Sequence, residues 1–303
     1  MTVAVTGATG FVGQMLLDQA ALAGVKLKAL ARKPQVERAG VSWIAGDLDS
    51  KAALNKLVKG AEAVIHVAGV VNTPDLAGFE AGNVTGTLNV IEAAKAAGVP
   101  RLIFVSSLSA REPGLSAYGA SKARAEKLVM ASGLDWTIVR PPGIYGPRDR
   151  DIFELFRLAR WGIMPMPPAG GRVSLIHVTD LSNLLLALIP SSEAVMQQIF
   201  EPDDGKVGGW SHHEMARAIG WAMGRRPYVL HLSRDWLNRA ARADAFLRRD
   251  KARLTADRVG YMAHPDWAVS DGAQVPRDVW QPKVETRAGL KATAGWYREQ
   301  RWL

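Results

Sequence analysis

Short runs of apolar, β-branched residues alternate with longer amphipathic stretches through the first half of the chain. The runs have the length of buried strands, and the stretches between them are rich in Ala, Leu and Lys and mostly end at Gly. The predicted strands are 3–6, 26–31, 42–45, 63–67, 102–106 and 137–140, and the predicted helices are 12–23, 51–58, 83–97 and 117–131. This alternation favours a parallel sheet with helices on both faces, so it predicts an α/β fold with a doubly wound parallel (Rossmann) sheet.

The pattern changes after residue 147. The later predicted helices are 152–161, 180–188, 211–223, 234–249 and 285–302, and the predicted irregular segments are 164–171 and 261–283. Residues 211–214 (SHHE) have the pattern of a helix capping box. We therefore expect a first domain over 1–150 and a smaller, mainly helical C-terminal lobe over 151–303, with the segments near 173–178 and 198–201 as candidate strands that return to the main sheet.

Residues 6–13 (TGATGFVG) directly follow the first predicted strand and open the first predicted helix. Gly7 permits a tight turn, Gly10 lets the backbone approach a pyrophosphate, and Gly13 lets the helix pack closely. A glycine triplet alone is weak evidence, because structural turns also contain glycines. Here strand, glycines and helix occur in the required order, which predicts a dinucleotide-binding turn.

The residues after the second predicted strand bear on which cofactor is bound. An acidic residue there accepts the ribose hydroxyls of NAD, whereas basic residues accommodate the 2′-phosphate of NADP. This chain has Arg32 and Lys33 at that place and no acidic residue between Asp18 and Glu37. The sequence therefore predicts a preference for NADP(H), with NAD(H) possible. The alternative is that the two cations stack on adenine or face solvent.

A proton-transfer site is predicted after the fifth strand. Tyr118 and Lys122 are four residues apart in a helical segment, so they share a helix face, and the ammonium group would lower the pKa of the phenol. A tyrosine with a lowered pKa can exchange a proton with a substrate oxygen near neutral pH. Ser106 and Ser107 end the fifth strand, where a hydroxyl could polarise the same oxygen. A Tyr/Lys pair alone is common, but this combination indicates catalysis.

Eight short motifs occur in the order that one enzyme family carries them. They are residues 6–13 (TGATGFVG), 46–48 (GDL), 66–69 (HVAG), 83–87 (NVTGT), 105–107 (VSS), 118–122 (YGASK), 140–147 (RPPGIYGP) and 177–180 (HVTD). On these motifs the chain resembles the extended short-chain dehydrogenase/reductase family, which also contains NAD-dependent epimerases and dehydratases. The resemblance covers the first half of the chain and reaches into the second.

The resemblance implies a role for each matched residue. Tyr118 is the expected catalytic residue, Lys122 also holds the nicotinamide ribose, and Ser107 donates a hydrogen bond to the substrate oxygen. Ser109 is the alternative donor, because the register at the strand end is open. The other cofactor-site residues that it implies, besides the glycines of the turn, are Thr6, Thr9, Phe11, Val12, Asp47, Leu48, Val67, Ala68, Gly69, Asn83, Pro141, Gly143 and Ile144.

Reversible hydride transfer between NADP and an alcohol or carbonyl compound is the simplest chemistry for these residues. A nucleotide-sugar epimerase is the alternative, and a non-catalytic NAD(P)-binding assembly or sensor subunit is the second one. Retention of Tyr118 and Lys122 argues against a non-catalytic subunit. Dehydration is disfavoured, because sugar dehydratases of the family usually carry Thr-Asp-Glu where this chain has Ser-Leu-Ser at 107–109.

The substrate is expected to be mainly apolar. Met164 and Met166 in 161–168 (WGIMPMPP) would line the substrate site, or would instead be core of the second lobe. Sugar-nucleotide enzymes of the family commonly have an Arg four residues before the position of His177, and this chain has Val173 there, although Arg172 is adjacent. The candidate substrate-site residues are Ser109, Tyr145, Met164, Met166 and His177.

Composition narrows the remaining possibilities. The chain has no cysteine, which excludes disulfides and thiolate chemistry, and no metal site is expected. No leader or membrane span is evident, so we expect a cytoplasmic protein that binds a small molecule and no nucleic acid, with a homo-oligomer possible. The net charge is +9, and the excess of basic residues is concentrated in the second half, notably at 234–258, where arginines, aspartates and apolar residues are interspersed. A solvated helix face is the simplest interpretation, and the sequence leaves open whether this segment binds anything.

Overall fold

The computed structural model describes residues 1–73, 75–249, 252 and 254–303. Three residues of the basic segment, Asp250, Lys251 and Arg253, lie outside them. The chain divides into two compact units. The first comprises Met1–Pro141, Leu181–Glu201 and Ala273–Gln281, and the second comprises Pro142–Asp180, Pro202–Gly272 and Pro282–Leu303.

A parallel sheet forms the centre of the first unit. Its strands are β1 (Thr2–Thr6), β2 (Lys26–Ala31), β3 (Val41–Ala45), β4 (Ala63–His66), β5 (Arg101–Val105), β6 (Asp135–Val139) and β11 (Gln198–Phe200). They lie in the order β11-β6-β5-β4-β1-β2-β3, and all neighbours are parallel. The strand order reverses between β1 and β4, which confirms the predicted doubly wound fold.

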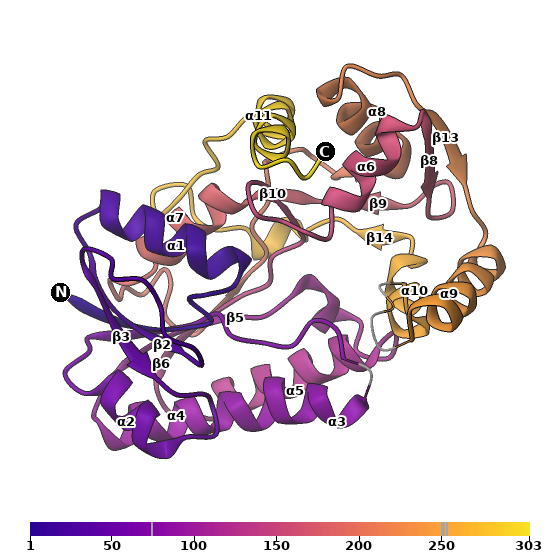
Figure 1. Ribbon diagram of the computed structural model, residues 1–303. Coiled ribbons are helices and arrows are strands. Elements are labelled where there is room, and N and C mark those ends of the chain that lie inside the picture. Colours follow the sequence, from indigo (N-terminus) through magenta and orange to yellow (C-terminus); the bar gives the residue numbers. More distant parts are fainter. Residues whose placement is uncertain (74, 250–251, 253) are drawn as a thin grey trace. The chain divides into compact units, whose positions relative to one another are not determined.

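Helices cover both faces of this sheet (Figure 1). Helices α1 (Phe11–Leu22) and α7 (Val178–Ala187) lie on one face, and α2 (Lys51–Val58), α4 (Gly86–Ala96) and α5 (Ala117–Met130) lie on the other. Side chains of α2, α4 and α5 pack with those of β4, β5 and β6 in one apolar core. The predicted helix 83–97 differs at its start, because a short helix α3 (Leu76–Phe79) and a π-helical turn (Glu80–Thr85) lead into α4.

The second unit combines helices with short strands. The helices are α6 (Phe153–Arg160), α8 (His212–Ala222), α9 (Arg234–Arg248), α10 (Ala256–Met262) and α11 (Thr286–Glu299). The strands are β7 (Gly143–Tyr145), β8 (Ile163–Met166), β9 (Arg172–Val173), β10 (Leu175–His177), β12 (Trp210–Ser211), β13 (Tyr228–His231) and β14 (Asp266–Trp267). Strand β10 pairs with β7, whereas segment 198–201 contributes β11 to the main sheet. The predicted capping box is confirmed, because Ser211 and Glu214 bond reciprocally at the start of α8.

The prediction of irregular structure over 164–171 and 261–283 was wrong in part. Strand β8 lies in the first segment and pairs in parallel with β13, from Tyr228 opposite Ile163 to His231 opposite Met166. The second segment begins inside α10 and contains β14. The partner of β8 lies more than sixty residues further along the chain, so local sequence carries no sign of the pairing. No helix in the described part of the chain is both long and apolar enough to span a membrane.

Candidate active site

The predicted site residues of the first unit follow the carboxyl ends of its parallel strands. Residues 7–13 follow β1, 32–33 follow β2, 47–48 follow β3, 67–69 follow β4, 106–109 follow β5, and Pro141 follows β6. Parallel strands all end at the same edge of a sheet, so these segments gather at one edge, where α/β proteins bind their ligands.

The turn after β1 is built for close backbone approach. Gly7 has φ +74°, and a Cβ there would lie 2.5 Å from the backbone nitrogen of Ala68, so any side chain at this position would clash with the segment after β4. Helix α1 begins after Gly10, which provides no side-chain cap. The first N–H groups of a helix have no partner within the helix and attract anions. A glycine turn followed by an uncapped helix N-terminus fits the pyrophosphate of a dinucleotide.

A buried hydrogen-bond chain holds this turn to neighbouring segments. Thr87 Oγ1 donates to the carbonyl oxygen of Asn83 (2.6 Å), so it accepts from Nε2 of His66 (3.0 Å). Nδ1 of His66 then accepts from Thr6 Oγ1 (2.5 Å), which itself accepts from the backbone N–H of Ala68 (3.3 Å). Burial, aided by the nearby Lys122 charge, lowers the pKa of His66 to about 3. A neutral imidazole with a defined tautomer therefore links β1, β4 and α4.

The residues expected near the adenosine half differ in their exposure. Arg32 and Lys33 are exposed directly after β2, and neither forms an ion pair with another described residue. Asp47 is also exposed, and its side chain accepts hydrogen bonds from the backbone N–H groups of Asp49 and Ser50 (both 3.1 Å). The carbonyl oxygen of Leu48 accepts from Asn89. Arg32 and Lys33 are thus accessible at the position that the sequence assigned to the adenosine half of the cofactor.

Lys122 is buried beneath the strand ends. Its Nζ donates to the carbonyl oxygen of Val105 (2.7 Å) and lies 4.3 Å from the ring centroid of Phe104. A Cβ built on Gly69 would lie 3.7 Å from this Nζ and 3.1 Å from Asn83 Oδ1, so the three predicted cofactor residues are neighbours. Burial lowers the pKa of Lys122 to about 7, although the carboxylate of Glu126 opposes the shift. The ammonium group can therefore lose its proton near neutral pH.

Tyr118 is half-buried one helical turn before Lys122 on α5. Its ring centroid lies 6.1 Å from that of Phe79, and its carbonyl oxygen accepts from Ser121 Oγ (2.7 Å). Ser121 Oγ in turn accepts from Asn83 Nδ2 (2.9 Å). The first turn of α5 is thus fixed to the predicted cofactor residue Asn83.

The two candidate hydroxyl donors contact each other. Ser107 Oγ lies 2.7 Å from Ser109 Oγ and accepts from the Ser109 backbone N–H (3.2 Å), which starts a short 3-10 turn over Leu108–Arg111. A Cβ on Gly119 would lie 2.6 Å from the Ser109 carbonyl oxygen, so α5 packs tightly on this turn. Ser107 is half-buried and Ser109 is buried, and the shared hydrogen bond makes them one unit.

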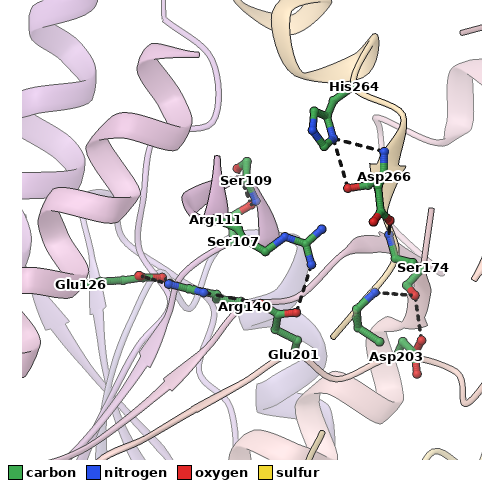
Figure 2. A network of polar contacts seen from close by, with 12 residues as sticks. Ser107, Ser109, Arg111, Glu126, Arg140, Ser174, Glu201, Asp203, His264 and Asp266 are labelled. Carbon is green, nitrogen blue, oxygen red and sulfur yellow. Dashed lines mark hydrogen bonds and ion pairs between the residues drawn. The ribbon is translucent and has the colours of Figure 1, made fainter. Parts of the chain in front are cut away.

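Sequence analysis missed a buried ion network beside this turn (Figure 2). Arg140 binds Glu126 through two hydrogen bonds, Nε to Oε1 (2.9 Å) and Nη2 to Oε2 (2.7 Å), and Ser106 Oγ donates to Glu126 Oε1 (2.5 Å). Arg140 and Arg111 also reach Glu201 (3.5 and 3.4 Å). Both glutamates are only 2% exposed.

The network ties together the parts that carry the predicted catalytic residues. Glu126 lies on α5 one turn after Lys122, Arg140 follows β6, and Glu201 follows β11. Hydrogen bonds to Glu126 are the largest of the contributions that raise the pKa of Arg140. The sequence signal was the spacing of Tyr118, Lys122 and Glu126, which places all three on one face of α5.

The predicted residues of the second unit lie in its interior. Tyr145 is fully buried, packs edge-on against His177 and donates to the carbonyl oxygen of Thr286 (3.4 Å). Met164 and Met166 are 0% and 1% exposed and belong to the apolar core of this unit. This is the core position that the sequence left open as the alternative for them. Gly143 and Ile144 form part of β7.

Among the described residues, no group of three or more His, Asp or Glu side chains is arranged to hold a metal ion.

The fold and this edge of the sheet define the chain as a Rossmann-type NAD(P)-binding protein. Residues 7–154 match the family model for NAD(P)H-binding proteins. The chain is 37% identical over 309 residues to a ceramide reductase from Caulobacter vibrioides, covering 99% of this chain and 96% of that protein. It is 28% identical over 259 residues to a UDP-glucose 4-epimerase from Vibrio cholerae, covering 76% and 78%.

The solved structure of MoeE5 in complex with UDP-glucose and NAD has a similar fold, with a TM-score of 0.77, 23% identity and coverage of 99% of this chain and 100% of that one. The chain belongs to the extended short-chain dehydrogenase/reductase family, as its motifs predicted. It is an NAD(P)-dependent oxidoreductase of that family.

The buried lysine predicts a pH dependence. Lys122 is cationic below its pKa of about 7 and loses its charge as pH rises through that value. Because the cation is expected to lower the pKa of Tyr118 and to hold the cofactor, kcat/KM for NADPH should fall above about pH 7, which gives the pH profile a falling limb. The Glu126 carboxylate raises the pKa of Lys122, so Glu126→Gln should move the falling limb to lower pH. A pH profile of both proteins measures this shift. Glu92→Gln changes an exposed carboxylate on α4 and should leave the limb in place. A limb unmoved by Glu126→Gln would contradict the role of Lys122.

Proposed function

We propose that the protein is an NADP-preferring reductase that converts a ketone of the ceramide class into the secondary alcohol. The observation that carries the proposal is the gathering of Ser107, Ser109 and Lys122 at one strand-end edge, with Tyr118 one helical turn from the lysine. These groups supply a proton and hydrogen bonds to a carbonyl oxygen, which is what ketone reduction requires.

Each of these side chains has a separate role in the proposed reduction. NADPH, when bound, supplies the hydride to the carbonyl carbon. Tyr118 gives its phenolic proton to the oxygen, and the ammonium group of Lys122 stabilises the phenolate that is left. Ser107, or Ser109 through the bond between them, donates to the same oxygen. The Glu126 and Arg140 pair keeps α5 at a constant position against the ends of β5 and β6, which preserves this geometry.

The choice of substrate rests on similarity over the whole chain. The sequence identity is 37% to the ceramide reductase and 28% to the epimerase. The match covers 96% of the reductase and 78% of the epimerase. A ceramide carries a secondary hydroxyl, which is the group that hydride transfer to a ketone forms. Val173 also stands where sugar-nucleotide enzymes of the family commonly have an arginine. We therefore favour a lipid ketone over a sugar nucleotide.

A substrate comparison tests the proposal. The protein with NADPH should oxidise the cofactor when given, in detergent micelles, a ceramide whose secondary hydroxyl has been oxidised to the ketone. Unmodified ceramide with NADPH is the control and should give no oxidation. Conversion of UDP-glucose to UDP-galactose, with no activity on the lipid ketone, would replace the proposed function by epimerisation.

A further inference from the structure

Helix α9 exposes an apolar stripe that no described residue of the second unit covers. Trp236, Ala240, Ala243 and Leu247 are exposed and spaced by four, three and four residues, so they share one helix face. Trp236 is 58% exposed and Leu247 is 78% exposed. Phe246, at the border of the stripe, is 84% exposed.

The stripe is separate from the face that holds α9 in the second unit. Leu237 and Ala241 are buried against Val259 of α10, which lies beside α9 (Figure 1). Trp236, Phe246 and Leu247 are not members of this apolar cluster. Three large apolar side chains grouped on one surface helix indicate a binding surface rather than scattered exposure.

The stripe has a positively charged border. Helix α9 contains four arginines and two aspartates. The exposed Arg239 and Arg242 lie on the side of the stripe that carries Phe246, where they outnumber one exposed carboxylate, Asp235. The guanidinium of Arg239 lies 4.9 Å from the ring centroid of Trp236. Arg248 pairs with Asp244 on the side facing α10, so it does not neutralise the border. Tryptophan, phenylalanine and leucine on one face with arginines beside them are typical of helices that lie in the headgroup region of a bilayer.

We propose that α9 docks the protein onto the surface of an anionic lipid bilayer. Trp236, Phe246 and Leu247 insert among the acyl chains nearest the headgroups, and Arg239 and Arg242 contact anionic headgroups. The choice of a bilayer rests on the proposed function, because a ceramide-class substrate resides in one. Charge complementarity selects anionic over neutral lipid.

Vesicle flotation tests the docking surface without cofactor or substrate. Vesicles of phosphatidylcholine with about one third phosphatidylglycerol should bind the protein, and phosphatidylcholine alone should bind it much less. The double variant Phe246→Ser with Leu247→Ser should weaken binding about tenfold or more, because two large apolar groups no longer leave water. The matched control is Val36→Ser with Val207→Ser, two positions that are 87% and 93% exposed elsewhere. Equal binding by both double variants would overturn the proposal.

Charge variants separate α9 from other cationic surfaces. Arg239→Glu with Arg242→Glu should weaken binding to the anionic vesicles about tenfold or more. Arg225→Glu with Arg226→Glu makes the same charge change at a pocket that Arg217, Trp221 and Arg287 also line, and it should have little effect. If the pocket variant lost as much binding as the α9 variant, α9 would not be the docking surface.

The absence of cysteine allows a site-specific readout. Leu247→Cys and Val207→Cys each introduce one labelling site for an environment-sensitive fluorophore. Emission from position 247 should shift to the blue on addition of anionic vesicles, and emission from position 207 should not. A blue shift at 247 that follows protein concentration without vesicles would show self-association and overturn bilayer docking. Activity on the micellar ketone is measured separately, so a protein that reduces the ketone but ignores vesicles loses only this inference.

Discussion

Tyr118→Phe should lower kcat for ketone reduction by at least about a hundredfold, the contribution expected of a positioned general acid. The substitution removes the transferable proton and leaves the ring that contacts Phe79. NADPH affinity should stay within about threefold of the parent, because the carbonyl oxygen of Tyr118 still accepts the hydrogen bond from Ser121 Oγ, which links this helix turn to Asn83. Steady-state kinetics and NADPH fluorescence titration measure the two quantities.

A matched control separates loss of this hydroxyl from loss of any tyrosine hydroxyl. Tyr228→Phe makes the same change at a position on β13 that is 70% exposed, and it should leave kcat unchanged. If Tyr118→Phe kept a kcat near that of the parent, the catalytic assignment would be refuted. Lost turnover together with lost NADPH binding would instead indicate a role in holding the cofactor.

Arg32→Asp should weaken NADPH binding about tenfold to a hundredfold, because a charge-assisted contact to a phosphate is worth about 1.5 to 3 kcal/mol. NADH has no 2′-phosphate, and a carboxylate at this position can accept its ribose hydroxyls, so its affinity should hold or improve. The preference should therefore shrink or reverse. The dissociation constants of both cofactors, from fluorescence titration of the parent and the variant, give the result.

Lys95→Asp is the control for net charge. Lys95 is exposed in the last turn of α4, which leads into the start of β5, so it lies at the opposite edge of the sheet from the strand ends. The variant should change both cofactor affinities alike and by little. Equal affinities of the parent for NADPH and NADH would refute the predicted NADP preference before any variant is made.

Interactions local in sequence explain why much of the first unit was predictable. Strands β1, β4, β5 and β6 are short, mostly buried runs. Two of the helices between strands begin at a local signal, Ser50 before α2 and Ser116 before α5, whose hydroxyls cap the following turn. A parallel sheet then brings every strand end to one edge, so residues 7–13, Arg32 and Lys122 could be assigned to one site without coordinates. The match to a full-length relative confirms the family and the enzyme class.

The features that the sequence left open or did not indicate depend on partners distant in sequence. Met164 could be a substrate-site residue or a core residue by sequence alone, because a Met and Pro-rich segment carries no sign of its neighbours. In the structure β8 pairs with β13, and Met164 is fully buried. The pair of Glu126 with Arg140, and its extension to Glu201, joins α5 to the ends of β6 and β11. No periodicity along one segment encodes such contacts.

Within the first unit, the sequence alone predicted the order of β1 to β6 and of the main helices between them, the glycine turn, the cations after β2 and the Tyr118 and Lys122 spacing. Each of these depends on residues within a few positions of one another. Only the tertiary structure decided that Lys122 is buried against Val105, that Ser107 and Ser109 share a hydrogen bond, and that α9 turns Leu237 inward and Leu247 outward. These features depend on which segments pack together, and packing sets the local dielectric that lowers the pKa of Lys122 to about 7. The sequence thus identified the residues of the candidate site, and tertiary packing set their exposure and, for Lys122, the pKa.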